Sequence, residues 1–186
     1  HLSALLSAVA EERPQTAWQI NMGSLYGVLE VARHHRCAVF FPSSIGAFGA
    51  GTPRDATPQD TIQRPSTIYG VTKVAGELLC DYYAQRFGVD VRGVRYPGLI
   101  SYQAPPGGGT TDYAVHIFHQ AIRYKHYTCF LRADTCLDMM YIFPGSPSTT
   151  RSIRCGSRSP TPGHAPWTIA PRAPSGVGSQ PTTLRG

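Results

Sequence analysis

The distribution of apolar and polar positions along residues 1–142 predicts an alternation of helices and strands. Over residues 66–87, apolar side chains recur every three or four positions, the spacing that places them along one face of a helix. We expect that face to pack on a sheet, and Gly88 to end the helix, because glycine readily adopts the left-handed backbone of a helix terminus. The predicted sheet-facing side chains are Ile68, Val71, Ala75, Leu78, Leu79 and Tyr82.

Short runs of β-branched and aromatic residues predict strands at residues 37–41, 89–96 and 137–142. Residues 1–4 predict the end of one more strand, and residues 16–35 and 113–124 predict two more helices. Proline-rich and glycine-rich stretches separate these elements. Strands that alternate with helices are typical of an α/β fold, so we expect a parallel sheet covered by helices.

The character of the chain changes after Ile142. Residues 143–186 comprise 44 residues, of which 27 are Pro, Gly, Ser or Thr, and they show no helical or strand periodicity. Such a segment buries too little apolar area to offset its conformational entropy, and we predict that it is disordered. The predicted organisation is therefore a catalytic region at residues 1–142 and a tail rich in Pro, Ser, Thr and Arg at residues 143–186.

The charge of the chain follows the same division. There are 17 Lys and Arg against 11 Asp and Glu, a net charge of +6, and five of the arginines lie in residues 143–186. Residues 1–142 are thus nearly neutral. Because the arginines of the tail are dispersed among Pro and Ser and carry no recognition motif, we expect no nucleic-acid partner.

Tyr69 and Lys73 carry the clearest chemical signal. They lie four positions apart in the helix predicted at residues 66–87, so their side chains share one face. A phenol titrates at about pH 10 and is a poor base at neutral pH unless a nearby positive charge favours the phenolate. Lys73 is the candidate for that charge. The alternative is an exposed pair on an amphipathic helix.

Ser44 follows the strand predicted at residues 37–41, at the end of a parallel strand where catalytic residues are often placed. A hydroxyl there can hydrogen-bond a substrate oxygen while Tyr69 removes or supplies its proton. The alternative for Ser44 is an ordinary turn serine or helix cap.

These residues resemble the extended short-chain dehydrogenase/reductases and, within them, the L-threonine 3-dehydrogenases. The most specific segment is Gly-Gly-Gly-Thr-Thr-Asp-Tyr-Ala at residues 107–114. The resemblance implies a Rossmann fold, NAD as cofactor and oxidation of the C3 hydroxyl of L-threonine to 2-amino-3-oxobutanoate. The segments that carry it are residues 1–8, 42–49, 63–70, 95–98, 107–114 and 139–142.

By this resemblance, Tyr69 is the general acid/base, Lys73 tunes it, Ser44 binds the substrate alcohol and Asn21 shapes the site. The alternative for Asn21 is a polar residue inside a helix, and the glycine run at residues 107–109 is also compatible with a flexible linker. The implied cofactor-binding residues are Leu2, Ser3, Tyr69, Lys73, Pro97 and Leu99. The implied substrate-binding residues are Ser7, Ser44, Tyr69, Thr110, Thr111 and Asp112.

A dinucleotide site also needs a first strand, a glycine-rich turn and a helix amino terminus for the pyrophosphate. None precedes His1, so we expect a partial Rossmann-like, doubly wound parallel sheet that lacks its first strands. We expect this truncated chain to bind NAD weakly and to be inactive. The alternatives are a non-catalytic, pseudogene-like remnant or binding protein, and a nucleotide-sugar epimerase/dehydratase. The Gly-Gly-Gly-Thr-Thr-Asp run at residues 107–112 argues against the epimerase/dehydratase.

The remaining chemistry narrows the function classes. Five cysteines with no secretory signal favour reduced thiols inside a cell. His116 and His119 lack partners with metal-ligand spacing, so we expect no metal site. No apolar run is long enough to span a membrane. The resemblance implies a small-molecule substrate, L-threonine, a homodimer in the intact family and a mitochondrial location.

Overall fold

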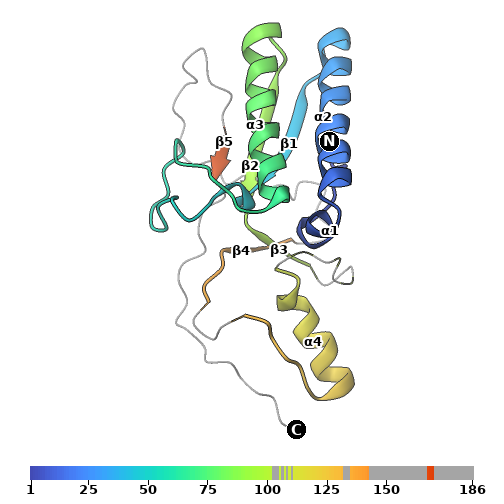
Figure 1. Ribbon diagram of the computed structural model, residues 1–186, viewed down its shortest axis with the longest axis vertical. Helices are drawn as coiled ribbons and strands as arrows, with labels where there is room; N and C mark the ends of the chain where they lie inside the picture. Colours follow the sequence, from blue (N-terminus) through green and yellow to red (C-terminus); the bar gives the residue numbers. More distant parts are fainter. Residues whose placement is uncertain are drawn as a thin grey trace. The chain divides into compact units, whose positions relative to one another are not determined.

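A computed structural model describes residues 1–101, 105, 107, 109, 111–131, 135–142 and 167–169. The described residues fall into two units, one formed by residues 1–96 and 167–169 and the other by the described residues of 97–142. Helices alternate with parallel strands in the order drawn in Figure 1, so the predicted α/β class is confirmed. Each unit is described by itself below.

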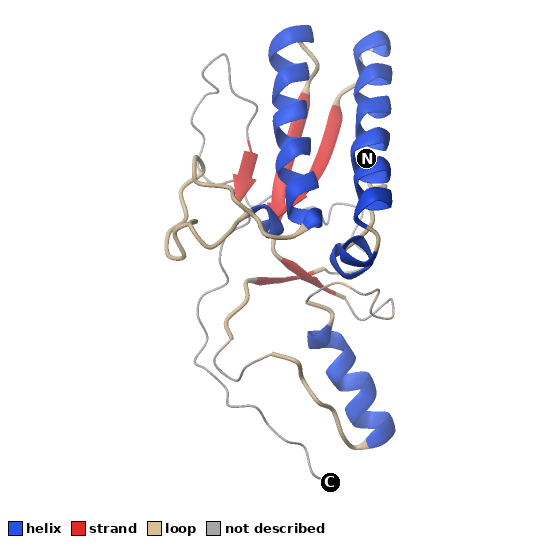
Figure 2. Ribbon diagram, in the orientation of Figure 1, coloured by secondary structure: helices blue, strands red, loops and turns tan. Residues whose placement is uncertain are grey.

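The first unit contains a parallel sheet in the order β1-β2-β5. Strand β1 (Val39–Ser44) pairs with β2 (Val91–Tyr96) in a register that sets Val39 beside Val91 and Ser44 beside Tyr96. Helices α2 (Pro14–His35) and α3 (Ile68–Phe87) lie side by side along this sheet (Figure 2). Their contacts with the strands form one apolar core, which contains Leu25, Leu29, Ala32, Val39, Phe41, Cys80, Tyr83, Val89 and Val91.

Local signals explain where helix α3 begins and ends. The Thr67 hydroxyl caps its amino terminus by accepting a hydrogen bond from the Gly70 N–H at 3.1 Å. The helix ends at Phe87, and Gly88 follows with φ of +69°. The predicted glycine stop is confirmed, because the left-handed backbone at this position carries a steric cost for any residue with a Cβ.

The predicted sheet-facing side of α3 is wrong for three of its six residues, whereas Leu79 packs against the core as predicted and Ile68 and Ala75 are half-buried. Val71, Leu78 and Tyr82 are 39%, 63% and 53% exposed, so they point to solvent. The buried face instead carries small and polar residues: Gly70, Thr72, Lys73, Gly76, Glu77, Cys80 and Tyr83. Close packing explains the reversal, since a Cβ on Gly76 would lie 2.5 Å from the Phe41 ring. The strand approaches the helix at its glycine, where no larger apolar side chain fits.

The amino terminus also differs from expectation. Residues 1–6 form no strand, although the His1 ammonium donates to the Phe40 carbonyl at 3.2 Å. A single terminal bond does not make a ladder. A short helix, α1 (Ser7–Glu12), follows and turns into α2 at Pro14, which fits the first turn of a helix because its missing N–H is not needed there.

Strand β1 is shifted relative to its predicted span of residues 37–41. It begins at Val39 and continues through Pro42 to Ser44, where the one-turn helix η1 (Ile45–Ala47) starts. Proline is tolerated because β1 lies at the edge of the described sheet, where a missing N–H need not remove a ladder hydrogen bond. Ser44 is therefore the last residue of the strand.

The second unit contains a two-stranded parallel sheet and one helix. Strand β3 (Gly98–Ile100), which lies in a predicted loop, pairs with β4 (Met139–Tyr141) inside the strand predicted at residues 137–142. Helix α4 (Tyr113–Tyr124) has the predicted bounds. Strand β3 was missed because three residues are too few to show a period-two pattern.

Of residues 143–186, the structure describes only strand β5 (Trp167–Ile169), which pairs in parallel with β2. This is a correction to the expectation of no strand there; Trp, Thr and Ile favour strands, but three residues carry no detectable periodicity. The prediction of disorder for the other residues of the tail lies outside the described residues. No described helix is long and apolar enough to cross a membrane.

Candidate active site

Ser44 and Tyr69 come together where β1 ends and α3 begins. Gly70 permits this approach, because a Cβ there would lie 2.2 Å from the Gly46 carbonyl oxygen in η1. The Ser44 hydroxyl caps η1 by accepting from the Gly46 N–H at 3.1 Å, as the helix-cap alternative predicted, and it also hydrogen-bonds Tyr69. The capping role and the candidate substrate role therefore fall on the same side chain.

Lys73 lies one turn further along α3 and is only 7% exposed. Its ammonium donates to the Pro42 carbonyl at 2.7 Å and lies 5.3 Å from the centre of the Tyr69 ring. Burial lowers the pKa of Lys73 to about 8, against the opposing field of the Glu77 carboxylate, which raises it. The amine therefore titrates close to neutral pH.

The pKa of Tyr69 is raised by burial, and the hydrogen bond with Ser44 lowers it in part. The sequence predicted that Lys73 would favour the phenolate. In the described residues, the pKa of Tyr69 is set by burial, which disfavours the charged phenolate, and by Ser44, and Lys73 is not among its causes. Tyr69 is thus a protonated phenol at neutral pH until further positive charge enters the site.

Asn21 is buried in α2 and bridges two segments. Its amide accepts from the Leu5 N–H at 2.7 Å, donates to the Leu5 carbonyl at 3.3 Å and donates to the Thr72 hydroxyl at 3.1 Å. The Asn21 amide thereby links Leu5, before α1, to Thr72 of α3. It therefore has a definite positioning role, beyond that of a polar residue inside a helix.

The segment that Asn21 holds carries three other predicted residues. Leu2 is 85% exposed and Ser3 is exposed, so both are accessible to a ligand, while Ser7 begins α1. The first unit thus brings together Asn21, Ser44, Tyr69 and Lys73, either in direct contact or through one intervening residue.

The other predicted residues belong to the second unit. Pro97 is buried, Leu99 is 39% exposed, and the side chain of Thr111 lies against Gly98, where a Cβ would come within 2.6 Å of the Thr111 methyl. Thr110 lies outside the described residues.

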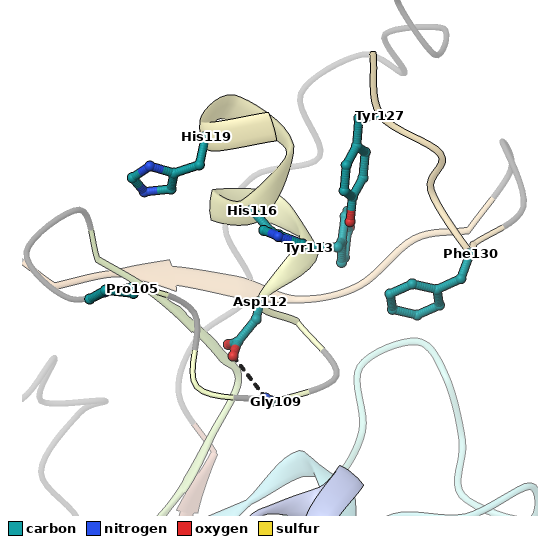
Figure 3. A pocket seen from close by; sticks show the side chains of 8 residues that line it. All are labelled: Pro105, Gly109, Asp112, Tyr113, His116, His119, Tyr127 and Phe130. Carbon is teal, nitrogen blue, oxygen red and sulfur yellow. Dashed lines mark hydrogen bonds between the residues drawn. The ribbon is translucent and has the colours of Figure 1, made fainter. Parts of the chain in front are cut away.

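Asp112 organises the glycine run instead of standing free. Its carboxylate accepts from the Gly107 N–H at 2.7 Å. It also accepts from the Gly109 N–H at 2.8 Å (Figure 3). These bonds fix a segment for which the sequence also allowed a flexible linker. Two of the acceptor positions of the carboxylate are therefore already used within the loop.

Asp112 also lines a cavity of about 500 Å³ in the second unit. Figure 3 shows that it is bounded mainly by rings, with the His116 ring 5.5 Å from that of Tyr127. His116 and Gln120 are hydrogen-bonded at 2.9 Å. No group of three metal-ligating side chains occurs in the part of the chain that the structure describes. The cavity is lined by Pro105, Gly109, Asp112, Tyr113, His116, His119, Tyr127 and Phe130.

A buried ion pair beside the site was not foreseen from the sequence. Arg95, at the end of β2, donates to Glu77 of α3 through its Nε at 3.0 Å and its terminal nitrogen at 2.7 Å, with both side chains almost fully buried. The signal was present: Glu77 follows Tyr69 and Lys73 at the same four-residue interval, and alternation in β2 places Arg95 on the buried side with Val91 and Gly93.

The residues present fit one end of a dinucleotide. Lys73 uses one of its three N–H donors on Pro42, which leaves two for ribose hydroxyls, and the Tyr69 hydroxyl lies within the same cluster. Among the described residues, no strand leads through a glycine-rich turn into a helix, the arrangement that holds a pyrophosphate. The fit is therefore to the nicotinamide ribose end.

The family model described as the NAD dependent epimerase/dehydratase family matches residues 1–129. The chain belongs to this family. Among curated relatives, an uncharacterized epimerase/dehydratase from Staphylococcus haemolyticus is 59% identical over 142 residues, which cover 76% of this chain and 45% of the relative. The chain spans about half the length of the curated relatives it matches.

More particularly, the chain is similar to structures of L-threonine dehydrogenases. The enzyme from Clostridium difficile is 60% identical with a TM-score of 0.73, over 76% of this chain and 44% of that one. The enzyme from Phytophthora infestans is 55% identical with a TM-score of 0.72, over 74% and 45%. A UDP-glucose 4-epimerase from Thermotoga maritima is 25% identical with a TM-score of 0.68, over 76% and 46%.

Proposed function

We propose that this chain carries the catalytic residues of an L-threonine 3-dehydrogenase that uses NAD. The observation that carries the proposal is the cluster of Ser44, Tyr69 and Lys73 at the end of β1, in a chain 60% identical to the Clostridium difficile enzyme. Identity to the Thermotoga maritima epimerase is only 25%, which favours threonine over a nucleotide sugar.

The chain's own residues supply proton transfer and positioning. Ser44 hydrogen-bonds the C3 hydroxyl of threonine, and the Tyr69 oxygen accepts the proton of that hydroxyl as C3 is oxidised. NAD, when bound, supplies the hydride acceptor. Lys73 holds the nicotinamide ribose, and its charge, together with that of the oxidised nicotinamide, offsets the burial that raises the pKa of Tyr69. The product is 2-amino-3-oxobutanoate.

For the amino-acid end of the substrate, the proposal takes the residues that the family resemblance implies. In this proposal Thr110, Thr111 and Asp112 bind the ammonium and carboxylate of threonine, with Ser7 of α1. Asp112 retains acceptor capacity beyond its two bonds to Gly107 and Gly109, so it can hold the loop and receive the ammonium.

Two wider features belong to the proposal. The exposed apolar strip of α3, formed by Val71, Leu78 and Tyr82, supports a homodimer in which two copies cover this strip. The mitochondrial location implied by the family resemblance stays a prediction, which imaging of the tagged full-length protein in the source cell tests.

The test is a chimera in which residues 1–142 replace the matching segment of the Clostridium difficile enzyme. We expect L-threonine-dependent formation of NADH, measured by absorbance, and a loss of about 100- to 10,000-fold in kcat on Tyr69→Phe with NAD affinity unchanged. Tyr82→Phe is the matched control, because it removes the same atom from an exposed ring and should retain full activity.

The 186-residue chain by itself forms the second arm of this experiment. Since its described residues address only the nicotinamide end of the cofactor, we expect no turnover and NAD binding weaker than in the chimera by about 1,000-fold, as expected when two or three charge-assisted hydrogen bonds are lacking. An active Tyr69→Phe chimera would refute the assignment, as would turnover of a nucleotide sugar in place of threonine.

A further inference from the structure

Three successive residues at the end of β1 are each held by one residue of α3. Lys73 donates to the Pro42 carbonyl at 2.7 Å, Tyr69 hydrogen-bonds Ser44, and Glu77 accepts a short hydrogen bond from the Ser43 hydroxyl. The three helical residues are spaced by four, which places them in one row on the buried face of the helix. Glu77 is the member of this row that the proposed chemistry does not use.

The carboxylate of Glu77 has every acceptor position occupied. Beyond Ser43, its oxygens accept from Arg95 Nε at 3.0 and 3.1 Å and from the second guanidinium nitrogen at 2.7 Å. Gln63 adds a bond at 2.9 Å, and the remaining Arg95 nitrogen donates to the Gln59 carbonyl at 3.0 Å. The pair thereby joins the ends of β1 and β2 to α3 and to the loop that precedes it.

Fold stability alone does not account for such a pair. Burying two charges costs desolvation that their attraction only roughly repays, and a well-packed apolar pair of similar volume is often as stable. Glu77 is 2% exposed and Arg95 is 4% exposed, so this cost applies in full. What an apolar pair would lack is a negative charge one helical turn from Lys73 and a fixed partner for Ser43.

We propose that Glu77, held by Arg95, is a positioning residue for the proposed dehydrogenase site: it fixes the end of β1 that carries Ser44 and sets a carboxylate one helical turn from Lys73. This inference rests on the proposed function for its catalytic consequence. Its electrostatic part concerns Lys73 alone. The field of Glu77 opposes the burial that lowers the pKa of Lys73, so removing the carboxylate leaves burial unopposed.

The other groups packed around Lys73 do not supply this charge. On α3, Tyr69 is a neutral phenol; from β1 the ammonium meets the Phe41 ring at 5.1 Å and the Pro42 carbonyl. The other charged groups on neighbouring elements have hydrogen-bond partners of their own. They are Glu11 of α1, which accepts from the Ile68 N–H; the His1 ammonium, which donates to Phe40; and Arg95 of β2, which pairs with Glu77. On α2, the neutral amide of Asn21 donates to Thr72, the residue before Lys73.

The direct test is a titration of Lys73 in the 186-residue chain. The chain has only two lysines, Lys73 and Lys125, so ¹³C-lysine labelling gives two side-chain signals that Lys125→Arg assigns. We expect the midpoint of Lys73 to fall by about one pH unit or more in Glu77→Gln, with that of Lys125 unchanged. Asp90→Asn, which removes one acid from the exposed pair with Arg92, is the matched control and should leave Lys73 unchanged.

A second variant separates positioning from folding. Glu77→Met combined with Arg95→Met removes both charges and keeps an apolar filling, so the fold should survive even where Glu77→Gln alone leaves Arg95 unpaired. In the chimera, we expect a fall in kcat of about 10- to 100-fold with little change in KM for NAD. The alkaline limb of the rate profile should move to lower pH together with the Lys73 midpoint.

The outcomes distinguish this inference from the proposed function. An unchanged Lys73 midpoint, or a double variant with full kcat and the parent pH profile, would show the pair to be structural only and overturn the inference. A chimera that fails to oxidise threonine while the Lys73 midpoint still falls would count against the proposed function and leave the electrostatic role of Glu77 supported.

Discussion

At the scale of single residues, burial sets the chemistry of the site. The phenol of Tyr69 and the amine of Lys73 are both moved toward their neutral forms, because each loses hydration and the charged form suffers more. The two pKa shifts oppose the proposed proton transfer at neutral pH unless added positive charge favours the phenolate. In the proposed function, the oxidised nicotinamide bound beside Lys73 supplies this positive charge to Tyr69.

The lowered pKa of Lys73 predicts a pH dependence of stability. In the folded chain the amine loses its proton near pH 8, whereas in the unfolded chain it keeps it until about 10.5. Between these values the unfolded state binds more protons, so stability should rise with pH; below pH 8 the full penalty is present. The difference between these two pKa values corresponds to a change on the order of 3 kcal/mol in the free energy of unfolding.

Denaturant unfolding of the parent and of Lys73→Met at pH 7 and pH 10 measures this effect. The parent should gain stability relative to the variant as the pH rises, and the comparison removes the contribution of the tyrosines that titrate in the same window. A difference between the two proteins that stays constant with pH would show that Lys73 is not buried as described.

At the scale of elements, one glycine decides how α3 meets the sheet. Gly76 lies against the Phe41 ring and Leu25, where an added Cβ would come within 2.5 and 3.1 Å. The close approach brings the row of Tyr69, Lys73 and Glu77 into reach of the end of β1. A larger residue would separate the helix from the strand and break these contacts together.

Gly76→Ala should therefore destabilise the chain by about 1–3 kcal/mol, although alanine is the better helix former. Gly23→Ala is the matched control on α2, because a Cβ there meets nothing within 4 Å and should add up to about 1 kcal/mol of stability. Thermal unfolding followed by circular dichroism compares them; equal effects from both substitutions would contradict the packing described for α3.

At the scale of the whole molecule, the exposed apolar strip of α3 is a candidate interface. Leu78 is 63% exposed on a helix whose opposite face is buried, and Val71 and Tyr82 extend the strip along the same side. Apolar surface of this kind commonly marks an interface. The proposed occupant is a second copy of the chain.

We expect Leu78→Glu to shift the chain from dimer to monomer in sedimentation or light scattering. Phe118→Glu is the control, since Phe118 is equally exposed at 64% but belongs to α4 in the other unit, and it should leave the dimer intact. A monomeric parent, or a dimer that survives Leu78→Glu, would remove this interface from the proposal.

The sequence by itself determined the features that depend on neighbours along the chain. The bounds of α4, the glycine stop of α3 and the shared face of Tyr69 and Lys73 all follow from spacing and capping within a few residues, and the structure has them as predicted. The family resemblance, which rests on the same local segments, was confirmed by the comparisons.

Only the tertiary structure decided which face of α3 is buried and what lies there. Val71, Leu78 and Tyr82, which were predicted to face the sheet, are exposed, and the buried face pairs Glu77 with Arg95 across 18 positions and with Ser43 across 34. Apolar periodicity assumes that hydrophobic burial alone orients a helix. In α3, two features outweigh hydrophobic burial: a glycine that lets the Phe41 ring pack closely, and polar side chains that bond to buried partners. Because these partners come from distant parts of the sequence, only the tertiary structure shows that they are in contact.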